Sequence, residues 1–246
     1  FGKDRRPMTI LLRAATLTNF ESVASACGLD ARRLLAEVGL PMRCLADPDL
    51  MVPAAAVGAV LELAAARGHE PAFGLRMAAA RRLSNLGPLG LLLRDQPTLR
   101  QALETLAARM HLHNEAMSVS VEQDGPLVAI REEMLIEGLP SVRQSIELAM
   151  GTTFRVLGIF LGEGWRPRMV TFRHPAPPST AWHRHVFGDV VAFGQAFNDI
   201  VCHAADLEAP NPGADPVMAR YSQRLLERDP GAHPSMTERV RRLIVL

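Results

Sequence analysis

The chain has 246 residues, of which 48% are hydrophobic and 22% are charged, which excludes a disordered protein and allows a large core. The formal net charge of +1 gives no general argument for nucleic-acid binding. Three widely spaced cysteines argue against a disulfide framework or a zinc cluster. The sequence has no run of about 18 apolar residues, so it does not predict a membrane span.

The first 113 residues carry mainly helical patterns. Asp30, Pro53 and Gly68 are residue types that begin or end helices, and each stands at the edge of an apolar pattern. In chain order, helices are expected over residues 10–26, 31–38, 53–67, 71–82 and from residue 97 onward. The clearest apolar stripe consists of Leu99, Leu103, Leu106 and Met110.

The pattern changes at Ala116. Residues 117–121 alternate between apolar and polar side chains, Asp124 and Gly125 form a turn signal, and residues 127–131 return as a partner strand. A long helix is expected over 141–161, a short one over 180–187, and strands over 169–173, 190–193 and 200–203. This order predicts an α+β fold, in which a helix-rich domain packs on a small antiparallel β-sheet or β-roll.

The last part of the chain indicates a domain boundary. Residues 209–215 are rich in Pro and Gly, and residues 216–228 form an amphipathic helix pattern that aligns Val217, Tyr221 and Leu225. Residues 237–246 begin a further helix for which the sequence offers no partner helix. We therefore expect a main domain over residues 8–208, a linker with a helix over 209–234, and the first helix of a truncated domain over 235–246.

The sequence contains no catalytic motif and no metal-ligand pattern. His111 and His113, like His183 and His185, are spaced by two residues, so on a helix the members of each pair face different sides. Ordinary surface or hydrogen-bonded histidines are the simpler interpretation. We predict no catalytic residue, no metal site, no cofactor and no enzymatic activity.

Arginines beside apolar segments suggest a different kind of site. The doublet Arg81 and Arg82 is interpreted as an exposed helix face. Isolated basic residues are more informative, because a buried arginine needs an anionic partner, which a ligand carboxylate can supply. The candidate ligand-binding residues are Arg13, Arg131, Arg143 and His174.

Five segments, in the right order, resemble AraC-type (AraC/XylS) transcription regulators with an arabinose-binding-like N-terminal half; the last segment resembles the opening helix of the family's DNA-binding domain. They are GLD to GLP over residues 28–41, FGLR with LGPLG over 73–90, QPTLRQAL over 96–103, VTFRHPAP with FGDVVAF over 170–193, and ERVRRLI over 238–244. Gln96 and Gln101 depart from the family, which usually has Ser and often Glu at these places.

The resemblance implies an effector-binding and dimerisation domain. A small organic effector, such as an organic acid, a fatty acid or an amino-acid derivative, would enter a pocket, and the chain would form a homodimer. DNA would be bound only through the missing C-terminal domain, whose helix-turn-helix begins at residues 235–246. Apart from the resemblance, the lack of a secretory signal and of a membrane-span pattern in the sequence leads us to expect a cytoplasmic protein with no membrane contact. The family's pocket residues follow no shared motif, so they cannot be carried over to this chain.

Two other readings remain open at this point. The chain could be a constitutive dimerisation module without a ligand, or an enzyme of unassigned type. An apolar pocket with one or two Arg or His residues would favour the effector domain over the dimerisation module. A cleft with a strongly perturbed acid or nucleophile would favour the enzyme.

Overall fold

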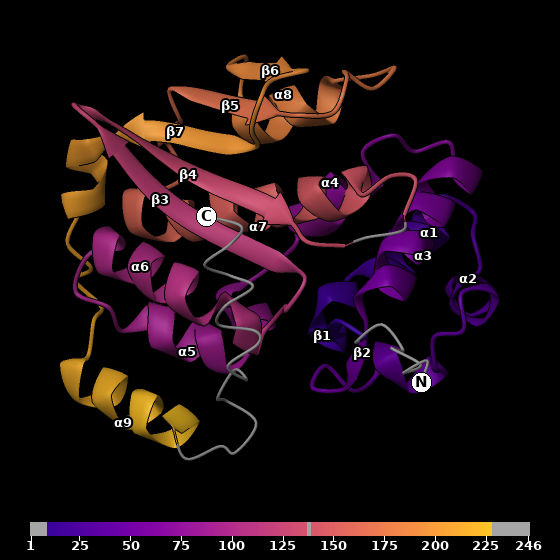
Figure 1. The fold of residues 1–246 in the computed structure, drawn as a ribbon, viewed down its shortest axis with the longest axis horizontal. Coiled ribbons are helices and arrows are strands. Elements are labelled where there is room, and N and C mark those ends of the chain that lie inside the picture. Colours follow the sequence, from indigo (N-terminus) through magenta and orange to yellow (C-terminus); the bar gives the residue numbers. More distant parts are fainter. Residues whose placement is uncertain (1–8, 137–138, 228–246) are drawn as a thin grey trace, which may run out of the picture.

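The computed structural model describes residues 9–136 and 139–227, and these form an α+β fold, as predicted (Figure 1). The α-helices are α1 (Phe20–Ala26), α2 (Ala31–Glu37), α3 (Ala54–Arg67), α4 (Phe73–Ala79), α5 (Pro88–Arg94), α6 (Leu99–Arg109), α7 (Arg143–Leu161), α8 (Ala181–Phe187) and α9 (Pro216–Glu227). The strands are β1 (Leu11–Arg13), β2 (Met51–Pro53), β3 (Met117–Asp124), β4 (Leu127–Met134), β5 (Met169–Phe172), β6 (Val191–Phe193) and β7 (Asp199–His203). Short 3-10 helices are η1 (Ala14–Leu17), η2 (Met42–Leu45), η3 (Leu83–Leu86), η4 (Met110–Leu112) and η5 (Ala204–Glu208).

The helix predicted over residues 10–26 is wrong in its first half. Leu11–Arg13 is strand β1, which pairs antiparallel with β2, and η1 follows. Asn19 then takes a left-handed conformation, with φ of +71°, and α1 begins only after it. Strands β1 and β2 have three residues each and lie far apart in the chain. Such short strands leave no periodic pattern in the local sequence, so the apolar residues of this segment resemble a helical stripe.

Two helix starts are capped by side chains, one predicted at Asp30 and one at Thr98 that is not among the predicted caps. The Asp30 carboxylate accepts hydrogen bonds from the backbone N–H groups of Arg32 and Arg33 at the start of α2. The Thr98 hydroxyl accepts one from Gln101 at the start of α6. These side chains satisfy backbone donors that have no partner inside the helix. All four residues of the predicted α6 stripe are buried.

Within the described residues, the main sheet has the strand order β3-β4-β7-β5-β6. Neighbouring strands are antiparallel except for β5 and β6, which are parallel. The β3–β4 hairpin lies where the turn signal predicts it: Asp124 pairs with Leu127, and Gly125, with a φ of +56°, and Pro126 form the turn. One face of this sheet packs on α6 and α7, and α8 lies beside β5 and β6 (Figure 1).

The buried apolar residues form two clusters. One cluster joins the sheet to α5, α6 and much of α7, and the other joins α1, α2, α3 and the β1–β2 pair. Helices α4 and α7, which pack along each other, contribute to both clusters. Their close approach depends on Gly151 of α7, because a Cβ there would lie 2.6 Å from the Ala78 Cβ and 2.8 Å from Leu75 Cδ1.

Helix α9 packs on α5, away from the sheet (Figure 1). Two residues of the apolar line predicted on this helix are exposed: Val217 is 48% exposed and Tyr221 is 57% exposed. Ser222 is the buried residue of this helix among those whose side chains are described. The expected helix over residues 237–246 lies outside the described residues. None of the described helices combines the length and the apolar character that a membrane span requires.

Candidate functional site

A narrow cavity of about 50 Å³ lies where the two apolar clusters meet. Its wall comes from β1, η1, α3, the turn after α4, η4, the β3–β4 hairpin and the middle of α7. Most of these side chains are apolar, and a few polar groups point into the space. A largely apolar cavity with a small number of polar groups is the usual form of a small-molecule site.

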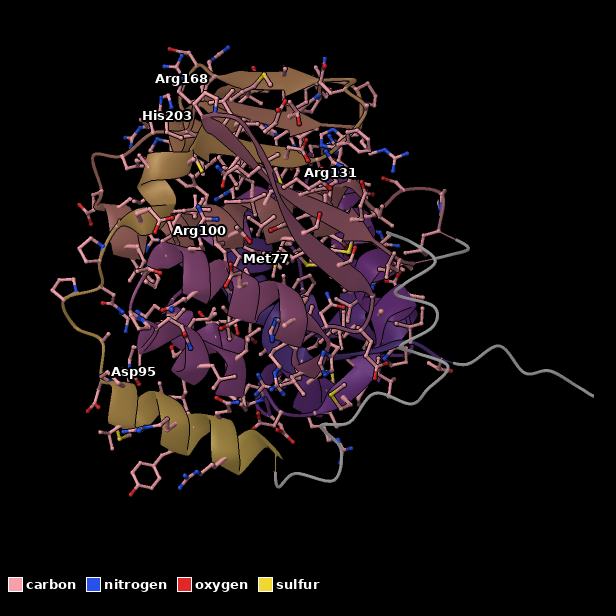
Figure 2. All side chains as sticks on the ribbon, turned by 60° about the vertical axis from the view of Figure 1, so that its left-hand side comes forward. Met77, Asp95, Arg100, Arg131, Arg168 and His203 are labelled. Atoms are coloured by element: carbon pink, nitrogen blue, oxygen red, sulfur yellow. The ribbon has the colours of Figure 1, made fainter. Side chains whose placement is uncertain are left out.

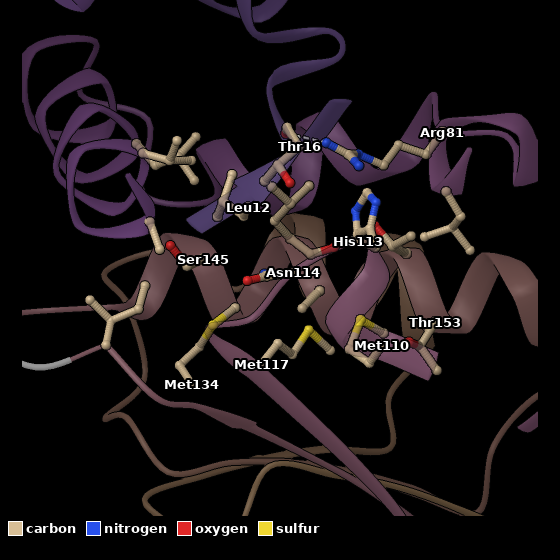
Figure 3. A pocket seen from close by; sticks show the side chains of 18 of the residues that line it. Leu12, Thr16, Arg81, Met110, His113, Asn114, Met117, Met134, Ser145 and Thr153 are labelled. Carbon is tan, nitrogen blue, oxygen red and sulfur yellow. Dashed lines mark hydrogen bonds between the residues drawn. The ribbon is translucent and has the colours of Figure 1, made fainter. Parts of the chain in front are cut away.

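The wall beside the sheet is rich in methionine. Met110, Met117 and Met134 lie together on one side of the cavity (Figure 3). A methionine side chain is unbranched and changes its rotamer easily, so it can fill an empty space and later make room for a ligand. The present volume suits a few water molecules, and a larger ligand requires these side chains to move.

Arg81 forms the opposite, polar end of the cavity. It follows the end of α4, is 3% exposed, and points its guanidinium toward Thr16, whose backbone carbonyl accepts a hydrogen bond from it (Figure 3). Among the described residues, the Arg81 Nε has no hydrogen-bond partner and no carboxylate lies within ion-pairing distance. Burial lowers the pKa of Arg81 to about 10, so the group remains charged at neutral pH.

His113 lies beside this guanidinium (Figure 3). It is 6% exposed, and burial, together with the charges of Arg81 and Arg13, lowers the pKa of its imidazole to about 3. The ring is therefore neutral at physiological pH. Its Nδ1 and the hydroxyl of Thr16 have no hydrogen-bond partner among the described residues. A cation, a neutral imidazole and a hydroxyl thus share one end of the cavity.

A second polar point lies at Thr153 of α7, which also lines the cavity. Its hydroxyl donates a hydrogen bond to the carboxyl group of Glu132, a fully buried residue of β4. Burial raises the pKa of Glu132 to about 7, although the Thr153 hydrogen bond opposes this shift. A carboxyl group that titrates near neutral pH therefore stands directly behind the cavity wall.

Of the four predicted ligand-binding residues, Arg13 lies nearest to this end of the cavity, but it does not line it. Its backbone N–H donates to the His113 carbonyl at 3.0 Å, and its guanidinium forms an ion pair with the exposed carboxylate of Asp49. Gly87 has a φ of +58° and lies against this guanidinium, so a Cβ at that position would collide with it. The side chain of Arg13 is therefore held in place beside the cavity.

Arg131 lies elsewhere, on the main sheet (Figure 2). Its guanidinium donates two hydrogen bonds to the Asp199 carboxylate on neighbouring β7, at 2.9 and 3.2 Å. It also pairs with Glu122 at 3.1 Å and lies 3.5 Å from the ring centre of Phe197. The protein itself supplies the anionic partners of this arginine.

Arg143 and His174 also stand outside the cavity wall. Arg143 is the first residue of α7, and His174 follows β5. The His174 Nε2 lies 3.5 Å from the buried carboxylate of Glu147. The His183 Nε2 lies 3.2 Å from the same carboxylate. Burial lowers the pKa of His174. The structure does not bring the four predicted residues together in one pocket.

Two cavity residues were misassigned by the sequence. Arg81 was interpreted as part of an exposed doublet, and His113 as an ordinary surface or hydrogen-bonded histidine, but both are buried at the cavity. Arg82 is exposed, as expected. The sequence predicts a helix over residues 71–82, whereas α4 ends at Ala79, so Arg81 lies in the turn to η3 and its side chain does not follow the helix surface.

Residues 28–211 match the protein family described as the arabinose-binding domain of AraC transcription regulators, at their N-terminus. The match covers most of the chain, and it agrees with an α+β fold that encloses a largely apolar cavity. The protein belongs to this family of N-terminal effector-binding domains of AraC-type transcription regulators.

Individual relatives agree with this assignment. The chain is 27% identical over 219 residues to the HTH-type transcriptional regulator VirS of Mycobacterium tuberculosis, a match that covers 88% of this chain and 64% of VirS. The chain thus spans less than two thirds of the length of these relatives. The crystal structure of the transcriptional regulator CdpR from Pseudomonas aeruginosa is similar in fold, with a TM-score of 0.60 at 20% identity, over 79% of this chain and 61% of CdpR.

Proposed function

We propose that this chain is the sensor part of a transcription regulator and binds a small organic acid in the cavity between its two apolar clusters. The observation that carries this proposal is Arg81, a buried guanidinium without a carboxylate partner among the described residues. An unpaired charge is very costly to bury. The carboxylate of an effector would supply the missing counter-charge through charge-assisted hydrogen bonds.

The surrounding groups fit this assignment. The Thr16 hydroxyl and the neutral His113 ring can donate further hydrogen bonds to a carboxylate, and Arg13 adds positive charge nearby. The methionine wall suits the apolar part of the same molecule. Arg131, Arg143 and His174 remain predicted ligand-binding residues, but nothing in the cavity geometry favours them.

Control of DNA binding would follow from the arrangement of the whole protein. The sensor domain would cover residues 8–208 and support a homodimer, the linker would cover 209–234, and a DNA-binding domain would begin at residues 235–246. The relatives named HTH-type regulators support this arrangement. An effector changes the output only if it binds one arrangement of the domains more tightly than the other.

The proposal is tested by calorimetric titration of the protein with octanoate and with octanol. We expect octanoate to bind more tightly than octanol by about tenfold or more, because octanol offers no charge to Arg81. Arg81→Gln should remove that preference, whereas Arg32→Gln, a change at an exposed arginine of α2, should leave it intact.

The comparison of acid with alcohol within each variant separates ligand recognition from any general loss of stability. Equal affinity of the wild-type protein for the two ligands would rule out recognition of the acid group. If neither ligand bound, and a wider panel of organic acids also failed to stabilise the protein, a dimerisation module without a ligand would be the better description.

A further inference from the structure

A second hollow opens next to the cavity, between the turn after α4 and the second half of α7. This groove of about 210 Å³ is lined by Arg81, Arg82, Leu83, Thr152, Arg155, Val156 and Ile159. Three of its seven lining residues are arginines, and none is acidic. The groove is therefore a site of concentrated positive charge on a chain whose formal net charge is only +1.

The charge of these arginines is not neutralised by the described part of the protein. Neither Arg82 nor Arg155 forms an ion pair there, and Arg81 has no carboxylate partner. Other arginines of the chain do find carboxylates, as Arg131 does with Asp199 and Arg173 with Glu133. Three like charges around one hollow create a positive potential that attracts an anion, although water screens the exposed Arg82 and Arg155 more than the buried Arg81.

The groove and the cavity are continuous at their walls. Arg81, Thr152 and Val156 line both of them. One molecule could therefore place an apolar chain among the methionines and its head group in the groove. Ile159, an exposed apolar residue of the groove, would cover the junction between the two parts.

We propose that the natural effector is an amphipathic molecule whose head group carries a phosphate or diphosphate, held by Arg81, Arg82 and Arg155. This inference rests on the proposed function and specifies the class of effector. A carboxylate has one charge and two oxygens, which Arg81 alone can satisfy. A phosphate monoester carries up to two charges and three free oxygens, which match several guanidinium groups.

The experiment compares octyl phosphate with octanoate in calorimetric titrations, below the concentrations at which either forms micelles. We expect octyl phosphate to bind about tenfold more tightly than octanoate, and this advantage should shrink as salt is added. Arg82→Gln and Arg155→Gln should each weaken octyl phosphate binding by about threefold, because both arginines are exposed, and should leave octanoate binding within about twofold. Arg168→Gln, at another exposed arginine outside the groove, is the matched control.

The two proposals fail in different ways. If octanoate binds through Arg81 but octyl phosphate binds no more tightly, or if Arg82→Gln and Arg155→Gln leave octyl phosphate affinity unchanged, the phosphate head group is wrong and the acid-binding cavity stands. If Arg81→Gln changes the affinity of neither ligand, the cavity is not the effector site and both proposals fall.

Discussion

At the scale of single residues, the cavity is set apart by side chains that are buried with an unusual charge state. Arg81 keeps its charge without a carboxylate partner among the described residues, His113 is held neutral, and Glu132 titrates near neutral pH. In each of the three, the first cause of the pKa shift is burial rather than a specific ion pair. Burial of this kind costs folding free energy, and functional sites commonly carry such a cost.

Glu132 makes this cost measurable through pH. Its pKa is raised from 4.5 to about 7 in the folded protein. The folded state therefore holds the carboxyl proton more tightly than the unfolded state does. The resulting contribution to the free energy of unfolding is complete below pH 4.5 and is lost as the pH rises through 7. We expect the free energy of unfolding to fall by up to about 3 kcal/mol between pH 4.5 and 8 from this group alone. Glu132→Gln should keep the Thr153 hydrogen bond and remove this part of the pH dependence.

The measurement is urea denaturation at several pH values between 4.5 and 8. Glu133→Gln is the matched control, because Glu133 is the next residue, is partly exposed and pairs with Arg173 at 3.2 Å. If the Glu132→Gln variant shows the same pH dependence as the wild-type protein, burial does not raise the pKa of Glu132 in the folded state.

The structure sets three of the four predicted ligand-binding residues apart from the cavity, and the particular residues show why the sequence does not do so. The sequence indicated a buried arginine that seeks a ligand carboxylate, but it could not select which arginine. Arg131 met the same criterion and proved to be paired with Asp199, a residue far away in the chain. Which arginine lacks a carboxylate partner depends on its neighbours in the folded protein, and the spacing of apolar residues in the sequence does not reveal them.

At the scale of elements, local signals were sufficient wherever a helix or hairpin is defined by its own residues. The α6 stripe, the Asp30 cap and the β3–β4 turn are in the structure as the patterns predict. The helix predicted over residues 10–26 is wrong where β1 lies, because β1 and β2 form strands only by pairing with each other. The exposure of Val217 and Tyr221 on α9 was likewise not predictable, since an apolar stripe does not show whether a partner lies against it.

The contact between α4 and α7 gives a prediction at this scale. Gly151→Ala should lower the free energy of unfolding by about 1–3 kcal/mol, because the new methyl group would meet Ala78 and Leu75 at distances shorter than van der Waals contact. Gly158→Ala on the same helix is the control: a Cβ there meets nothing within 4 Å, so the change should be neutral or stabilise by up to about 1 kcal/mol. Urea denaturation of the two variants measures the difference. Equal effects would mean that the helices do not approach as closely as described.

At the scale of the whole molecule, the cavity lies where two apolar clusters meet, and α4 and α7 belong to both. A ligand between the methionine wall and Arg81 would contact residues of both apolar clusters and move them apart. Such a position is suited to a sensor, since occupancy of the cavity can alter how the two parts of the domain pack. The response still requires a difference in affinity between the two arrangements.

The central claim is that the cavity between the clusters binds the acid group of an effector at Arg81. A crystal structure of the protein with octanoate tests it most directly. We predict the carboxylate within hydrogen-bond distance of the Arg81 guanidinium, the chain among Met110, Met117 and Met134, and these methionines in changed rotamers. Octanoate bound at Arg131 or on the surface, with the cavity side chains unchanged, would contradict the account.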